Sequence, residues 1–257
     1  MNKIRVIPCL LLKNKGLVKT KQFKDSIYVG DPINAVKIFN DKEADELLFI
    51  DIEASKLGRG PDYELLSRIV KEAFMPFGYG GGVKTLDDIT KLLHLGIEKV
   101  CINSFAIKDI EFVKKASDLV GSQSIVISID VKKDFFGKFK VYDYLKQKTT
   151  NLDPVEFAKQ VELKGAGEIL LMSVDKEGTF EGYNLELISK VSKAVNIPVV
   201  ALGGASEVND FKEAINAGTS AVSAGSLFVF YGPNKAVLIN YPIQKNFLRE
   251  QNEWFKR

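Results

Sequence analysis

Histidine, tryptophan and cysteine are scarce in this chain of 257 residues, which has one histidine, one tryptophan and two cysteines. The lone histidine, His94, lies within a predicted helix, so we expect no histidine-based catalysis. Cys9 and Cys101 stand far apart in apolar runs and form no cluster with metal-ligand spacing, so no metal and no cofactor are expected. We interpret both cysteines as buried, reduced thiols of a cytoplasmic protein.

Long hydrophobic runs and strong charge are also missing. No apolar run approaches the roughly 18 residues of a membrane helix, and the first five residues do not begin a signal peptide. The net charge is only +3, and no basic patch interleaved with aromatic residues occurs, which argues against nucleic acid as the main partner. We therefore predict a cytoplasmic protein that binds neither membrane nor nucleic acid.

Two glycine-rich stretches, residues 77–83 and 199–205, stand out among what is present. Each is a short apolar run that ends in small residues just before a helical pattern, which is how a strand presents backbone N–H groups to a phosphate. The setting repeats with an offset of 122 residues, which relates Gly81 to Gly203, Gly96 to Gly218 and Ser104 to Ser226. We interpret the chain as two similar halves, each with a phosphate cradle.

Strand-like and helix-like patterns alternate along the whole chain. The expected strands are 4–12, 46–52, 77–80, 99–102, 124–131, 168–172, 198–202 and 220–224. Helices are expected at 32–44, 62–73, 85–95, 110–120, 154–164, 184–195 and 207–217, with a last one from about Pro233. Eight buried strands, each followed by a helix, predict a (β/α)8 barrel in a single domain, 1–257. Residues 13–30 are expected to form a mobile loop, 132–144 an inserted hairpin, and the tail 243–257 either a docked helix or a frayed end.

The mouth of such a barrel lies at the C-terminal ends of its strands, where carboxylates and small residues gather. Asp51, Asp130 and Asp175 are the candidate acid/base residues there, and Asp130 follows the apolar run 125–129, so burial should raise its pKa. A role as helix cap or salt-bridge partner remains the alternative for Asp51. The candidate phosphate-binding residues are Gly81, Gly82, Asn103, Ser104, Gly178, Gly203, Gly204, Gly225 and Ser226.

Several motifs together resemble a known family. Residues 6–10, 48–55, 80–82, 102–104, 129–132, 165–171, 175–179 and 203–205 are similar to the cyclase subunit of imidazole glycerol phosphate synthase, a lyase-type, HisF-like subunit of a glutamine amidotransferase. The resemblance implies a barrel that binds a phosphoribulosyl substrate by its two phosphates and receives ammonia from a class I glutaminase docked on the N-terminal face. Arg5, Glu46, Lys99 and Glu168 match its ammonia gate, although a simple salt-bridge layer is the alternative.

One position departs from the family pattern. The family's acid/base aspartate on the first strand falls at Leu11, and leucine can neither donate nor accept a proton. Losing half of an acid/base pair typically costs on the order of 10²–10⁴-fold in rate. Met172 and Leu202 also replace small polar residues near the mouth, which makes one end of the pocket more apolar.

The segments 10–12, 16–20, 28–36 and 59–62 look like the paralogues of surface-polysaccharide (lipopolysaccharide) gene clusters, which convert a sugar acetamido group to an acetamidino group. That resemblance implies ammonia addition to a carbonyl carbon on a phosphorylated sugar, activated by a separate ATP-dependent enzyme, with Lys19 closing over the substrate. Two alternatives remain: true cyclase activity in histidine biosynthesis, and a non-catalytic ammonia conduit.

Overall fold

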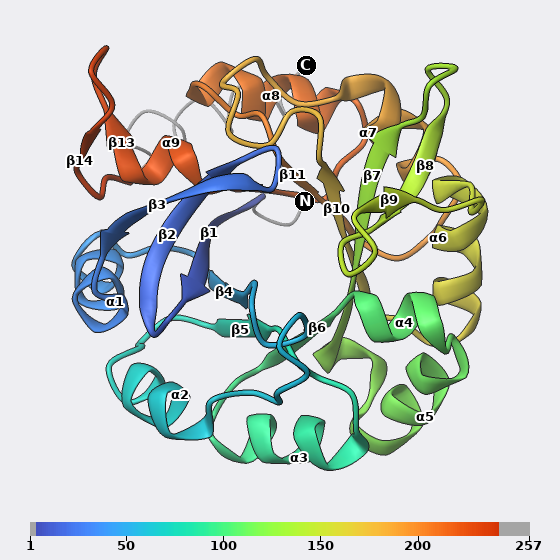
Figure 1. Cartoon of the computed structure of the whole chain (residues 1–257), viewed down its shortest axis with the longest axis horizontal. Coiled ribbons are helices and arrows are strands. Elements are labelled where there is room, and N and C mark those ends of the chain that lie inside the picture. The colour runs from blue at the N-terminus through green and yellow to red at the C-terminus, as the bar shows by residue number, and fades with distance from the viewer. Residues whose placement is uncertain (1–3, 242–257) are drawn as a thin grey trace.

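Eight parallel strands close into a barrel in the computed structural model, which describes residues 4–241 (Figure 1). In the order in which they pair around the barrel, they are β1 (Arg5–Lys13), β4 (Leu47–Asp51), β5 (Phe77–Gly80), β6 (Lys99–Ile102), β7 (Ile125–Lys133), β10 (Glu168–Ser173), β11 (Val199–Leu202) and β12 (Ala221–Ala224). The pairing of β12 with β1 completes the ring. The sequence prediction of a (β/α)8 barrel is confirmed.

Helices surround the barrel on all sides in Figure 1 and cover its outer apolar surface. They are α1 (Pro32–Asp41), α2 (Tyr63–Val70), α3 (Leu86–His94), α4 (Ser104–Lys108), α5 (Glu111–Val120), α6 (Pro154–Leu163), α7 (Leu185–Ser192), α8 (Val208–Asn216) and α9 (Ser226–Val229), with a short 3-10 turn η1 (Ser122–Ser124). No helix in the described part of the chain is long and apolar enough to span a bilayer.

The helix caps repeat with the same offset of 122 residues as the glycines. Asp31 and Asp153 cap α1 and α6, and each is followed by proline at the first helical position. The side chains of Asp62 and Asn184 likewise cap α2 and α7, by accepting from a backbone N–H three residues later. A capping box begins both α3, at Thr85, and α8, at Glu207. The two halves therefore share their local start signals as well as their glycines.

Three predictions about segments outside the barrel strands need correction or comment. Residues 13–30 form an ordered hairpin, β2 (Gly16–Lys21) and β3 (Lys24–Gly30), which extends β1 as an antiparallel ribbon. The expected helix near Pro233 is wrong, because Pro233 lies in the turn between β13 (Phe230–Tyr231) and β14 (Ala236–Val237). The tail 243–257 lies outside the described residues.

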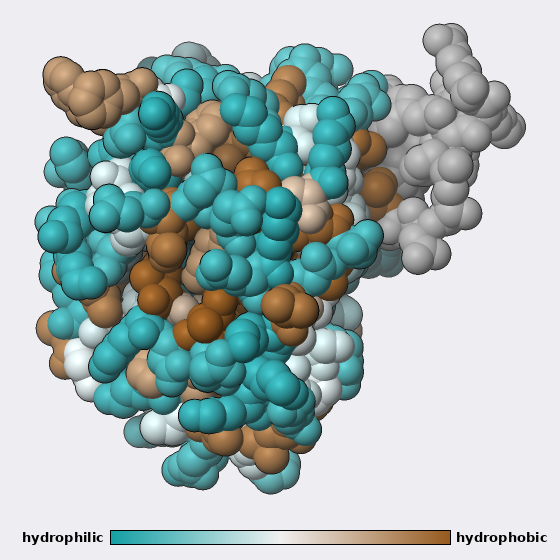
Figure 2. All heavy atoms as spheres, turned by 90° about the vertical axis from the view of Figure 1, so that its right-hand side faces the viewer, coloured by the Kyte–Doolittle hydropathy of each residue, from teal (hydrophilic) through white to brown (hydrophobic). Residues whose placement is uncertain are grey.

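The predicted insertion after β7 is a hairpin, as expected. β8 (Phe139–Asp143) pairs antiparallel with β7, and β9 (Lys148–Thr149) pairs with β8. Its tip carries Phe135 and Phe136, which are 98% and 82% exposed. Figure 2 shows this side of the molecule as mostly hydrophilic, with an apolar projection standing out at the upper left.

Inside the ring of strands a second apolar cluster fills the barrel. It is made of Ile7, Cys9, Leu48, Cys101, Val126, Leu170, Met172, Val174, Val200, Leu202 and Ala221. Because strands of a barrel alternate inward and outward, these residues form a column between the charged bottom and the open mouth.

Candidate active site at the mouth of the barrel

A cavity of about 320 Å³ opens at the C-terminal ends of the strands, and residues from all eight barrel strands line it. This is where barrel enzymes carry their active sites. All nine predicted phosphate-binding residues and two of the three predicted acid/base residues line the cavity. No group of three histidine, cysteine, aspartate or glutamate residues within the described ranges could hold a metal ion.

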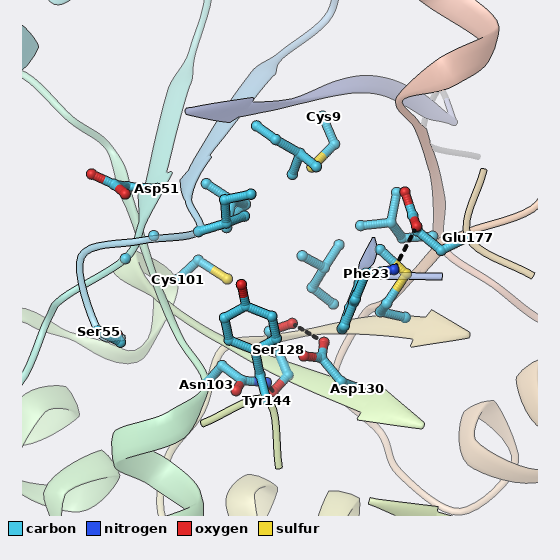
Figure 3. Close-up of a pocket in the computed structure, with 18 of the residues that line it drawn as sticks. Cys9, Phe23, Asp51, Ser55, Cys101, Asn103, Ser128, Asp130, Tyr144 and Glu177 are labelled. Atoms are coloured by element: carbon cyan, nitrogen blue, oxygen red, sulfur yellow. Dashed lines mark hydrogen bonds between the residues drawn. The ribbon is translucent and has the colours of Figure 1, made fainter. Parts of the chain in front are cut away.

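Asp130, on β7, is one of the buried carboxyl groups of the cavity, at 8% exposure. Its Oδ1 accepts a hydrogen bond from Ser128 Oγ at 3.2 Å (Figure 3). Burial raises the pKa of Asp130 to about 7, and interactions with the Ser128 and Asn103 side chains offset part of that effect. A carboxyl group with such a pKa can exchange a proton near neutral pH.

Asp51 and Asp175 are held by other groups. Asp51 Oδ1 accepts from the backbone N–H groups of Glu53 and Ala54, and Arg59 forms an ion pair with the carboxylate at 3.0 Å. Figure 3 shows the Asp51 carboxylate directed away from Asp130. Asp175 lies outside the cavity lining, and its Oδ2 accepts from the backbone N–H of Lys133 at 2.9 Å. Of the three predicted acid/base residues, Asp130 is thus the one that lines the cavity and forms no ion pair with any residue of the described part of the chain.

The two glycine cradles face each other across the mouth, because β5 and β11 lie four strands apart in the ring of eight. Gly82 has a φ of 71° and Gly204 a φ of 110°, values that side chains rarely allow. A Cβ at Gly82 would lie 2.7 Å from the carbonyl oxygen of Arg59, so the close approach also requires glycine. Ser55 Oγ accepts from Gly82 N at 3.1 Å at one edge of this cradle.

Lys19 is buried rather than mobile. It lies on β2 at 3% exposure, and its Nζ donates to the backbone oxygen of Cys9 at 2.7 Å. A side chain at Gly225 would clash with the Lys19 ammonium group, which places Lys19 beside the cradle of β12. Burial lowers the pKa of Lys19, and nearby Cys9 and Glu177 partly counter this. The expectation that Lys19 belongs to a mobile loop is corrected, because Lys19 lies on the ordered strand β2; that it closes over a substrate stays a prediction.

Glu177 holds the β2–β3 hairpin over the mouth. Its carboxylate accepts from Thr20 Oγ1 at 3.0 Å and from Phe23 N at 3.1 Å, and its backbone oxygen accepts from Gln22 N at 3.0 Å. The Phe23 ring then meets the ring of Tyr144 edge-on, with centroids 5.7 Å apart. The two inserted hairpins therefore meet above the cavity (Figure 3).

Sequence reasoning missed several residues of the lining. Phe23, Tyr144, Arg59, Lys84 and Lys108 all face the cavity. A signal was present for the last three, which follow predicted strands or cradles at the same end of the barrel. The two aromatic residues come from insertions, whose course no repeat or period specifies.

Cys9 and Cys101 line the floor of the cavity. Burial raises the pKa of Cys9 to about 11 and raises that of Cys101 further above its usual range. Thiols with raised pKa values are poor nucleophiles. This agrees with their interpretation as core residues.

The predicted gate residues form a closed ring at the bottom of the barrel. Arg5 pairs with Glu46 at 2.5 Å and also with Glu168, while Lys99 pairs with Glu46 at 3.1 Å and with Glu168 at 2.6 Å. Burial alone would lower the pKa of Arg5, but the two glutamates outweigh it and raise the pKa. The sequence prediction that these four charges meet at the strand starts agrees with the geometry.

Comparison with known proteins places the chain in a family. Residues 5–233 match the model of the histidine biosynthesis protein family. The chain is 48% identical over 239 residues to a Pseudomonas aeruginosa protein provisionally named imidazole glycerol phosphate synthase subunit hisF2, covering 93% of this chain and 95% of that one. It is 44% identical over 249 residues to imidazole glycerol phosphate synthase subunit HisF of Hydrogenobaculum, covering 96% of both chains.

A protein of Leptospira interrogans, provisionally named as subunit HisF of the same synthase, is 46% identical over 244 residues and is covered to 96%. These matches span the barrel, its cavity and the ring of charges together. The chain therefore belongs to the histidine biosynthesis protein family, among the HisF-like cyclase subunits of imidazole glycerol phosphate synthase.

Proposed function

We propose that this chain is the ammonia-using subunit of a glutamine amidotransferase that forms an acetamidino group on a phosphorylated surface-polysaccharide sugar. One observation supports the proposal above all. Asp130 keeps one of the family's two acid/base positions, while the apolar residue Leu11 stands where the family has its other aspartate. Both side chains line the cavity. A site with one acid/base carboxyl group suits a single nucleophilic addition better than it suits a cyclisation, which uses two such groups.

The proposed chemistry needs little from the barrel itself. A partner enzyme first uses ATP to attach a phosphoryl or nucleotidyl group to the acetamido oxygen. The nitrogen of ammonia then forms a bond to the acetamido carbon, and the oxygen leaves with the attached group. Asp130 accepts the proton that the attacking nitrogen releases. With a pKa of about 7, a large fraction of its carboxyl group is ionised and ready to accept at neutral pH.

The route of ammonia supports the same assignment. The charged ring of Arg5, Glu46, Lys99 and Glu168 stands below an apolar column that leads to the cavity. A class I glutaminase docked against this lower face would release ammonia where the ring meets solvent. Uncharged ammonia can cross an apolar column, while the ammonium ion would lose most of its hydration there.

The experiment measures ammonia-dependent activity with purified protein and excess ammonium salt, without glutaminase, on two substrates. The first is the phosphoribulosyl aminoimidazole substrate of the histidine pathway; the second is an acetamido sugar phosphate with an ATP-dependent activating enzyme. Amidine formation without cyclase turnover supports the proposal. Cyclase turnover at a rate typical of the family would contradict it and restore the histidine-pathway function.

The second candidate function is that cyclase activity itself, favoured by the 44% identity to the Hydrogenobaculum subunit over nearly all of the chain. Leu11→Asp provides a matched test. If the missing carboxyl group is the sole obstacle, this variant gains cyclase turnover by on the order of 10²-fold or more over the parent. A third candidate, a pure ammonia conduit, predicts that Asp130→Asn leaves amidine formation unchanged.

A further inference from the structure

The charges around the cavity are distributed unevenly. Three cationic side chains gather on the side of β4, β5 and β6: Arg59 from the loop after β4, Lys84 from the loop after β5, and Lys108 from α4. They stand around the Gly81–Gly82 cradle and Asn103. Asp51, paired with Arg59, is the acidic residue of this side, so the three cations exceed the carboxylates by two charges.

These cations retain free donors. Lys84 Nζ donates to the carbonyl oxygen of Gly58 at 2.9 Å, and an ammonium group has three N–H donors. Lys108 Nζ lies 5.7 Å from the centre of the Phe105 ring. This cation–π contact is not a hydrogen bond to an acceptor, so it leaves the N–H groups of the ammonium available. Both can therefore donate to an anionic ligand without giving up their present contacts.

The side of the mouth that lies across from β4 and β5 is formed by β10 and β11, and it presents apolar side chains between its glycines. Met172 and Leu202 line the cavity there and belong to the buried column of the barrel, while Leu11 lines it from β1, between β12 and β4. The charged groups of the lining there are Glu177, which repels anions, and Lys19, whose ammonium group donates to the backbone oxygen of Cys9; Lys176, beside Gly204, is paired with Glu181. Burial disfavours the charged form of Lys19, so it is a weak counter-ion for a second phosphate.

We infer that the ligand of this cavity carries its negative charge at one end only, as a phosphate or diphosphate ester bound on the Arg59, Lys84 and Lys108 side. An uncharged part of the same molecule lies against Leu11, Met172 and Leu202. The glycines and Ser226 of the second cradle also line the cavity, but Lys19 is the one cationic side chain of the described lining beside them, so a second phosphate would be bound more weakly there. This inference rests on the proposed function for the sugar character of the ligand.

The orientation has a chemical consequence. The uncharged end lies near Asp130, so the group that reacts with ammonia is remote from the phosphoryl group. An acyl group attached to a sugar ring fits this position, since its methyl group can pack on the apolar wall while its carbonyl carbon faces the carboxyl group.

Titration calorimetry with three ligands tests the inference. In UDP-N-acetylglucosamine and N-acetylglucosamine 1-phosphate all negative charge lies on one side of the sugar ring, whereas ribulose 1,5-bisphosphate carries a phosphate at each end of its sugar. We expect at least one single-ended ligand to bind as tightly as the bisphosphate or more tightly. Clearly tighter binding of the UDP-sugar assigns the site to a diphosphate, and similar affinities assign it to one phosphoryl group. Binding of the bisphosphate more than tenfold tighter than both, or no binding by any ligand, would overturn the inference.

Variants on the two sides give a sharper comparison. Lys84→Ala removes an exposed cation and should weaken single-ended ligands about tenfold, the equivalent of one charge-assisted hydrogen bond. Lys148→Ala, which removes an exposed lysine outside the cavity lining, is the matched control and should have no effect. Leu202→Ser makes the second cradle polar and should improve bisphosphate binding relative to the UDP-sugar. Equal losses for Lys84→Ala and Lys148→Ala would contradict the assignment.

Thermal unfolding of each variant shows that it is folded before binding is compared. The inference and the proposed function can fail separately. Single-ended binding without amidine formation retains the inference and refutes the function. Amidine formation on a sugar that binds independently of Lys84 and Lys108 retains the function and refutes the inference.

Discussion

Asp130 illustrates how burial sets the chemistry of one residue. The carboxyl group is buried behind an apolar strand, and no cation of residues 4–241 pairs with it, so the neutral form is favoured. Asp51 lies at the same end of the barrel but is stabilised by two backbone N–H groups and Arg59. Two aspartates with similar sequence settings therefore lie in different electrostatic environments because of their partners, which the sequence pattern alone does not specify.

The first prediction concerns activity. Asp130→Asn removes the proton acceptor, so ammonia-dependent kcat/KM should fall on the order of 10²–10⁴-fold. In the parent protein, the rate expressed per concentration of free NH3 should rise through about pH 7, as the carboxyl group ionises, and then level off. Asp175→Asn is the control, because Asp175 lies outside the cavity. An unchanged pH profile in Asp130→Asn would show that another group accepts the proton.

The same residue predicts how stability depends on pH. The pKa of Asp130 is raised to about 7 from 3.8, so the folded state binds a proton more tightly than the unfolded state between these values. The stability that this residue contributes is thus present at low pH and lost as pH rises toward 7. Asp130→Asn removes this loss, on the order of 4 kcal/mol at full ionisation. We expect its Tm to exceed that of the parent more at pH 8 than at pH 5; equal differences would contradict the buried charge.

At the scale of elements, the β2–β3 hairpin shows how a loop becomes ordered by a distant contact. Its residues include Lys, Gly and Asp, a composition that predicts a flexible segment. Five non-glycine residues of the segment 13–30 have a positive φ: Asn14, Lys15, Gln22, Phe23 and Asp25. Glu177, more than 150 residues later, fixes the turn through Thr20, Gln22 and Phe23. Local sequence signals cannot report such a long-range contact.

Removing that contact should loosen the hairpin without unfolding the barrel. In Glu177→Ala, hydrogen exchange at the Phe23 amide and cleavage by trypsin after Lys21 and Lys24 should both accelerate at least tenfold, since two hydrogen bonds to a buried carboxylate are lost. The cooperative Tm should change much less. Glu181→Ala removes an exposed carboxylate from the same loop and serves as control. Unchanged exchange at Phe23 would show that the hairpin is held by other contacts.

The barrel strands and most helices were predictable from the sequence, and the physical reason is local. The predicted bounds of strands 77–80 and 99–102 are the same as the observed bounds, because glycine ends the first strand and lysine begins the second. Capping residues such as Asp31 and Thr85 specify where the helices begin. The last helix was misplaced at Pro233, because a proline at N1 and a proline in a turn look alike in sequence. The cavity's charge asymmetry depends on which loops fold inward, and this needed the structure.

At the scale of the whole molecule, the two ends of the barrel are chemically opposite. The mouth holds a buried carboxyl group between a cationic side and an apolar wall, and the bottom holds four alternating charges that neutralise one another. The apolar column joins the ends. A reaction that consumes ammonia delivered from below needs both ends at once, whereas a reaction supplied with ammonium from solution needs only the mouth.

This division yields the last prediction. Lys99→Met leaves Arg5 alone between two buried glutamates and opens the ring, while Asp130 and the cavity are untouched. With a glutaminase partner, glutamine-dependent product formation should fall at least fivefold relative to glutamine hydrolysis, because ammonia escapes at the disturbed ring. The rate with excess ammonium salt should stay within twofold of the parent. Lys164→Met, which breaks only the surface pair with Glu111, is the matched control. If both nitrogen sources were affected equally, the ring would be a structural layer of salt bridges and not a gate.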